Sequence, residues 1–145
     1  MASTSTITII GKKLGENDYD AIVDFVASCG GTFDIDGFVQ GALVDDDGMD
    51  FVIEPVNDRD PTALARSLIG SGRLSTMDCA IELDGKTRYY NFDYHYDDRL
   101  VITINSNRVE LEDGMTDFNW HYKNLVSKLS GTVMEVESVV FCDDL

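Results

Sequence analysis

Four short stretches between residues 77 and 111 alternate apolar and polar residues, and pairs of turn-forming residues separate them. These pairs are Asp84 and Gly85, Asp97 and Asp98, and Ser106 and Asn107. Alternation with a period of two is typical of strands with one buried face, and such short turns join antiparallel neighbours. The segment therefore predicts an antiparallel meander with strands over residues 77–83, 87–96, 100–105 and 108–111.

The N-terminal half shows the same alternation. It predicts strands over residues 5–10, 32–36, 38–44 and 49–55, with a tight hairpin turn at 45–48 in which Gly48 supplies a positive φ angle. In the stretch 49–55, three apolar residues share one face and two acids share the other: Met49, Phe51 and Ile53 against Asp50 and Glu54. Because a half-buried strand turns its apolar face to the core, we expect these two acids, like Asp34 and Asp36, to point to solvent.

Three segments repeat apolar residues at the spacing of an amphipathic helix. The first is capped by Asn17 or Asp18 and stops at Gly30, the second starts with Asp60 as cap before Pro61 and runs to Ile69, and the third covers 116–129. Their apolar stripes are Tyr19, Ile22, Val23, Val26 and Cys29; Leu64, Ala65, Leu68 and Ile69; and Phe118, Tyr122, Leu125, Val126 and Leu129. A last strand is expected over 132–141.

These elements predict one α+β domain over residues 1–145, mainly an antiparallel sheet with about three helices packed on it in a single layer. The chain is long enough to bury a core without disulfide or metal crosslinks. Its three cysteines are far apart, with no Cys-x-x-Cys pair, which is typical of reduced thiols in a cytoplasmic protein. We find no signal sequence and no apolar run of membrane-spanning length, so we expect a cytoplasmic location.

Acidic residues concentrate in one stretch of the sequence. Between Lys13 and Arg59 there are 45 residues without Lys or Arg, and twelve of them are Asp or Glu, which accounts for most of the net charge of -16. A field of one sign attracts counter-ions or a cationic partner. It argues against direct binding to nucleic acid or to an anionic membrane, because both require a basic surface.

No motif for catalysis or metal binding stands out. The run of acids before Gly48 resembles a calcium loop, but Leu43 falls where the first acidic ligand belongs, so a solvated hairpin tip is the better interpretation. The two histidines, His95 and His121, have no second strong metal ligand and no nucleophile motif nearby in sequence. We therefore expect no cofactor, no metal and no catalytic residue.

The densest aromatic stretch covers residues 89–98. Strand alternation places Tyr90, Phe92, Tyr94 and Tyr96 on one face. This face either packs under a helix or forms an exposed aromatic surface beside acids, a composition that favours a basic partner.

In size, charge and architecture the chain resembles the small acidic α+β immunity proteins that bacteria pair with nuclease toxins, including those of contact-dependent growth inhibition and interbacterial secretion systems. The resemblance implies tight binding to a cognate basic toxin and no catalysis. Phage anti-defence proteins that mimic nucleic acid follow the same logic. The predicted partner-binding surface consists of Asp34, Asp36, Asp45, Asp46, Asp47, Asp50 and Glu54, with Tyr94 and Tyr96 as anchors.

Two alternatives remain open at this point. An excess of Asp over Lys is also typical of proteins adapted to a high-salt cytoplasm, in which case the acids need no partner. The third hypothesis is an enzyme or small-ligand domain whose site is assembled from residues scattered along the chain.

Overall fold

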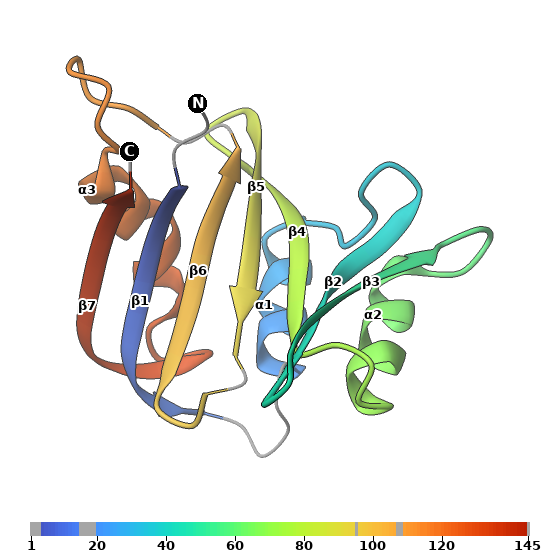
Figure 1. Ribbon diagram of the computed structural model, residues 1–145. Coiled ribbons are helices and arrows are strands. Elements are labelled where there is room, and N and C mark those ends of the chain that lie inside the picture. The colour runs from blue at the N-terminus through green and yellow to red at the C-terminus, as the bar shows by residue number, and fades with distance from the viewer. Residues whose placement is uncertain (1–3, 15–19, 95, 107–108, 145) are drawn as a thin grey trace.

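A seven-stranded antiparallel sheet organises the molecule (Figure 1). The computed structural model describes residues 4–14, 20–94, 96–106 and 109–144. The spatial order of the strands is β3-β2-β4-β5-β6-β1-β7, so the first and last strands of the chain lie side by side. The strands are β1 (Thr4–Lys13), β2 (Phe38–Asp45), β3 (Gly48–Pro55), β4 (Thr76–Leu83), β5 (Lys86–Asp93), β6 (Arg99–Ser106) and β7 (Met134–Asp144).

The helices form one layer behind the sheet as drawn in Figure 1. They are α1 (Asp20–Ser28), α2 (Pro61–Gly70) and a C-terminal helix made of α3 (Phe118–His121), the π-helical turn η1 (Tyr122–Val126) and α4 (Ser127–Leu129). The expected α+β architecture, with an antiparallel sheet and one helical layer, is thereby confirmed. In the described part of the chain, no helix is long and apolar enough to cross a membrane.

Alternate residues of the central strands form the core beneath the helices. The residues buried there are Ile7 and Ile9 of β1, Tyr90 and Phe92 of β5, and Leu100, Ile102 and Ile104 of β6. The buried helix residues that cover them include Ile22, Val23, Phe25, Val26, Leu64, Leu68, Leu125 and Leu129. The aromatic face of β5 therefore packs under helices, which was one of the two interpretations of that stretch.

Several local predictions hold. The hairpin turn closes on the pair Asp45 and Gly48, Gly48 has a φ of 134°, and the Asp47 N–H donates to Asp45 Oδ1 at 2.9 Å. Asp60 caps α2 by accepting from the Ala63 N–H at 3.0 Å.

Other predictions fail, in part or completely. Residues 32–36 do not form a strand, because Asp36 and Gly37 adopt positive φ angles of 53° and 91° and Asp34 Oδ1 accepts from the Gly37 N–H, which bends the chain. Of the segment 108–111, Arg108 lies outside the described residues, and Glu110 forms only an isolated bridge with Thr116. The predicted caps Asn17 and Asp18, like Tyr19 and His95, also lie outside the described residues.

The C-terminal helix departs from the predicted apolar stripe because of its π-helical turn. A π turn holds an extra residue, so it changes which side chains face the sheet. As a result His121 is fully buried, while Tyr122, expected on the apolar stripe, is 46% exposed. Leu125, Val126 and Leu129 keep their predicted buried positions.

Candidate functional site

The face of the sheet opposite the helices carries small and polar side chains. The register places Asp78 of β4 beside Asn91 of β5, and Asn91 beside Thr103 of β6. The neighbouring row consists of Thr76, Asp93 and Val101. Strand alternation explains the arrangement, because every second residue of these strands is buried under the helices and the intervening ones face the other way.

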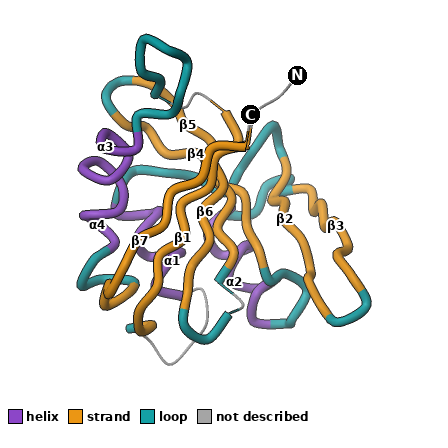
Figure 2. The backbone as a smooth tube through the Cα atoms, turned by 60° about the vertical axis from the view of Figure 1, so that its left-hand side comes forward, coloured by secondary structure: helices purple, strands orange, loops and turns teal. Residues whose placement is uncertain are grey.

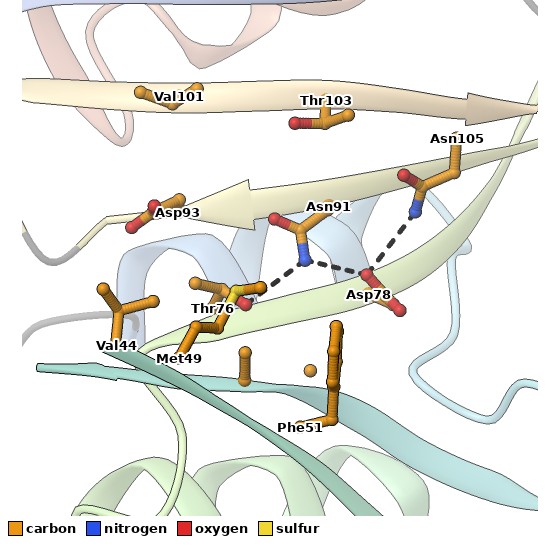
Figure 3. Close-up of a pocket in the computed structure, with 12 residues that line it drawn as sticks. Val44, Met49, Phe51, Thr76, Asp78, Asn91, Asp93, Val101, Thr103 and Asn105 are labelled. Carbon is orange, nitrogen blue, oxygen red and sulfur yellow. Dashed lines mark hydrogen bonds between the residues drawn. The ribbon is translucent and has the colours of Figure 1, made fainter. Parts of the chain in front are cut away.

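A groove opens on this face between β3 and the central strands (Figure 3). Its volume is about 500 Å³, and its lining includes Met49 and Phe51 on the β3 side. Figure 3 shows the polar side chains of β4, β5 and β6 across from them. We call this site the open-face groove.

The groove exists because the hairpin of β2 and β3 diverges from the rest of the sheet (Figure 2). In the named strands, β2 pairs with β4 at Gly41 with Met77 and at Ala42 with Thr76, whereas β2 pairs with β3 along its whole length. Gly41 allows this close crossing, since a Cβ atom there would lie 2.0 Å from the carbonyl oxygen of Thr76. The hairpin is thus joined to the sheet at one point and leaves space beside it.

A carboxylate with amide partners lies in the floor of the groove. Asp78 Oδ1 accepts from Asn91 Nδ2 at 2.8 Å and from Asn105 Nδ2 at 3.4 Å. Burial raises the pKa of Asp78 above its usual value, and the two amide hydrogen bonds act in the opposite direction. None of the ion pairs among the described residues includes Asp78. A cation entering the groove would therefore give this carboxylate an opposite charge.

The apolar side of the groove contradicts the sequence prediction for β3. Met49, Phe51 and Ile53 are 55%, 79% and 60% exposed, although we expected them to be buried. The helix layer covers the opposite face of β3, where Val52 packs against the core. Alternation shows which residues share a face, but it does not show which face the helices cover.

The predicted acidic residues lie in two separate places. Asp45, Asp46 and Asp47 form the exposed hairpin tip next to the groove, whereas Asp34 and Asp36 lie in the bend before β2. The strand between these two places has eight residues, which corresponds to roughly 25 Å. The acids at the hairpin tip and those in the bend are therefore separated by the length of β2.

Asp50 and Glu54 lie on the helix side of β3, away from the groove. Asp50 is exposed, but Glu54 is only partly so. The carboxylate of Glu54 lies 3.4 Å from the guanidinium groups of both Arg59 and Arg73. Glu54 is thus already neutralised within the chain.

The predicted aromatic anchors do not line the groove. Tyr94 is 1% exposed and its hydroxyl donates to the Val133 carbonyl at 3.2 Å, so it belongs to the core and is not a surface anchor. The reason is that Tyr94 lies on the same face of the sheet as Tyr90 and Phe92, which face the helices. Tyr96 is half-buried, with the Arg99 guanidinium 4.1 Å from its ring centre.

Sequence reasoning missed the groove residues Asp78, Asn91 and Phe51. A signal for Asp78 was present, because it lies between the apolar residues Met77 and Cys79 in a strand at the middle of the sheet. A polar residue at that position indicates that the second face of the sheet is not packed against another layer.

The buried histidine forms a second polar cluster, within the core. His121 Nε2 accepts from the Val109 N–H at 3.3 Å, so in the neutral ring the proton lies on Nδ1, 3.3 Å from the Tyr90 hydroxyl. Burial lowers the pKa of His121 to about 4, and nearby Arg88 acts in the same direction. Both ring nitrogens are engaged in hydrogen bonds, which indicates a structural role.

The described residues contain no group of three or more His, Cys, Asp or Glu side chains placed to hold a metal ion. Comparisons with protein-family models, curated proteins and solved structures find no match to the chain. The open-face groove and its charges are therefore the basis on which a function can be proposed.

Proposed function

We propose that the chain is a non-catalytic acidic binding protein whose open-face groove takes a cationic side chain of a basic protein partner. One observation carries this proposal. The described residues that line the groove number twelve; among them are two carboxylates, Asp78 and Asp93, and no Lys or Arg, and exposed apolar residues lie along one side.

This combination suits the side chain of Lys or Arg. The aliphatic stem of such a residue can pack on Met49 and Phe51 while its charged head pairs with Asp78. An Arg guanidinium can also stack on the Phe51 ring, an interaction of about 0.5–1 kcal/mol at an exposed site. The groove therefore offers both an apolar and an anionic contact to the same residue.

The charge of the whole molecule favours the same partner. A net charge of -16 accelerates association with a basic protein and excludes acidic ones. The exposed hairpin tip, Asp45 to Asp47, directly follows the groove residue Val44 and extends the anionic surface. In its most specific form, the proposal is a cytoplasmic bacterial immunity protein that inhibits a cognate toxin, with a nuclease as the target because nucleases present basic clefts to phosphates.

Co-expression with the product of the adjacent reading frame tests the immunity form. The proposal expects this product to be toxic alone and harmless with the chain, with a stable complex of the two proteins. Asp78→Asn, which removes one charge with little change in shape, should weaken protection. Glu112→Gln, the same charge change in an exposed loop, should not. A non-toxic product would refute the immunity form, and full protection by Asp78→Asn would refute the role of the groove.

The size and polarity of the groove also favour a second candidate, a domain that binds a small polar ligand. About 500 Å³ lies in the usual range for small-molecule sites, and the side chains of Asn91, Asn105 and Thr103 offer hydrogen bonds there. The two candidates differ in salt dependence. Binding of a basic protein weakens as KCl increases, whereas binding of an uncharged ligand does not.

A further inference from the structure

Strand β3 forms one edge of the sheet and ends the strand order. Within the described residues it pairs with β2 and with no strand on its other side. Edge strands of this length, eight residues, are normally protected, because their free backbone groups attract further strands. Here the edge is accompanied by exposed apolar side chains, which increases the tendency to pair.

The register shows which backbone groups point outward. Hydrogen-bonded and non-hydrogen-bonded pairs alternate along an antiparallel ladder. The Ala42 carbonyl accepts from the Ser75 N–H at 2.8 Å, so it points toward β4 and away from β3. The pair of Ala42 and Phe51 is therefore a non-hydrogen-bonded pair, and the Phe51 N–H and C=O point to the free edge.

The other end of β3 gives the same assignment of hydrogen-bonded and non-hydrogen-bonded pairs. The Val56 N–H donates to the Gly37 carbonyl at 2.9 Å, which makes that pair hydrogen-bonded. Since hydrogen-bonded and non-hydrogen-bonded pairs alternate, the residues of β3 whose backbone groups point to the free edge are Ile53, Phe51 and Met49. Pro55, at the next outward position, has no N–H to offer and ends the usable edge.

The outward backbone groups thus belong to the three residues whose side chains lie on the open face. On the opposite face of the strand, Asp50 is exposed. The acidic hairpin tip lies at the N-terminal end of β3. A strand added here would place its residues opposite Met49, Phe51 and Ile53 on the open face, and the residues between them on the face of Asp50. Apolar residues match the first set and basic residues match the second.

Resting on the proposed function, we propose that an extended segment of the basic partner, with alternating apolar and basic residues, adds to β3 as an eighth, antiparallel strand. A second copy of this chain is a poor occupant, because each copy carries a net charge of -16 and the acidic hairpin tip lies beside the edge. Charge complementarity instead selects a cationic segment.

A synthetic peptide of alternating Lys and Val, equal in length to β3, is the probe. In an antiparallel pair, residues opposite Met49, Phe51 and Ile53 direct their N–H groups at β3. These are the Val residues of the peptide. Methylation of the backbone nitrogen of every Val should weaken binding by about tenfold or more. Methylation of the backbone nitrogen of every Lys should leave the affinity close to that of the parent peptide. The charge is the same in both.

Each outcome of this comparison is informative. Equal affinity of the two methylated peptides would overturn strand addition and leave binding of a basic partner intact. Tighter binding of the peptide methylated at Val than of the peptide methylated at Lys would overturn the proposed antiparallel register, in which Val lies opposite Met49, Phe51 and Ile53. If the parent peptide itself did not bind, this inference would fail, and the proposed function would still be decided by the co-expression test with Asp78→Asn.

A matched pair of protein variants tests the same edge. Phe51→Pro removes the outward N–H without removing a hydrogen bond to β2, and Phe51→Ala removes the same ring but keeps the N–H. Thermal melting checks that both remain folded. The inference expects Phe51→Pro to bind the parent peptide more weakly than Phe51→Ala. Equal binding would contradict it, as would a dimer through β3 in sedimentation experiments with the wild-type protein.

Discussion

The buried His121 should make the protein lose stability as pH falls from about 6.5 to about 4. Its pKa is lowered to about 4 from a usual value of 6.5. Burial is the main cause, and Arg88 on β5 adds to it, while Asp117 and Asp143 oppose it. Between these two pH values the unfolded chain binds a proton at this site and the folded protein does not, so stability rises with pH in this window.

The magnitude follows from the size of the shift. A difference of about 2.5 pKa units at about 1.4 kcal/mol per unit corresponds to about 3 kcal/mol when the pH reaches 4. At pH 5 about 2 kcal/mol should be lost, because roughly 1.5 units of the window have then been crossed. Above pH 7 the ring is neutral in both states and the contribution is complete.

Urea denaturation of the wild-type protein and of His121→Gln, measured from pH 7.5 to pH 4, isolates this effect. Gln is neutral throughout and can accept from the Val109 N–H as Nε2 does. His95 and the acidic residues are common to both proteins and cancel in the difference. The stability gap between wild type and variant should shrink by about 3 kcal/mol toward pH 4. A gap that stays constant with pH would refute the buried, neutral state of His121.

Further predictions concern the hairpin, a helix cap and the acidic surface. Gly41→Ala should cost about 2–4 kcal/mol in urea denaturation because its Cβ meets the Thr76 carbonyl, whereas Gly70→Ala, with open space around it, should be neutral or stabilising. Asp60→Ala should lower the stability by about 1 kcal/mol through loss of its bond to the Ala63 N–H, and Asp58→Ala, an exposed control, should cost less than about 0.5 kcal/mol. The protein should remain folded at low KCl concentration by circular dichroism; unfolding there would favour the salt-adaptation alternative.

The sequence predicted elements whose signals are local. The turn at Gly48 and the cap at Asp60 depend on the chemistry of a few adjacent residues, so their patterns predict them directly. The burial of Tyr90 and Phe92 follows from alternation in a strand at the middle of the sheet. Alternation showed that Tyr90 and Phe92 share one face of the strand, but only the structure shows that this face is in the core and not on an exposed surface.

The failures concern facts that only the assembled sheet determines. Alternation in β3 grouped Phe51 with Met49 correctly, but the position of the helix layer decided that these residues face solvent. The π-helical turn that buries His121 has no signal in the spacing of apolar residues. Likewise, the separation of Asp34 from the hairpin tip depends on the length and direction of β2.

The most direct test of the account follows the side-chain and backbone NMR signals of the protein during titration with N-acetyl-arginine amide, a minimal model of the basic side chain that the groove is proposed to take. The account predicts the largest shifts at Met49 and Phe51 on β3, and at the side-chain amides of Asn91 and Asn105 next to Asp78. Exposed acids elsewhere, such as Glu112, should shift little. Shifts of similar size at all acidic positions would mean that charge alone attracts the arginine derivative, and would contradict a binding site in the open-face groove.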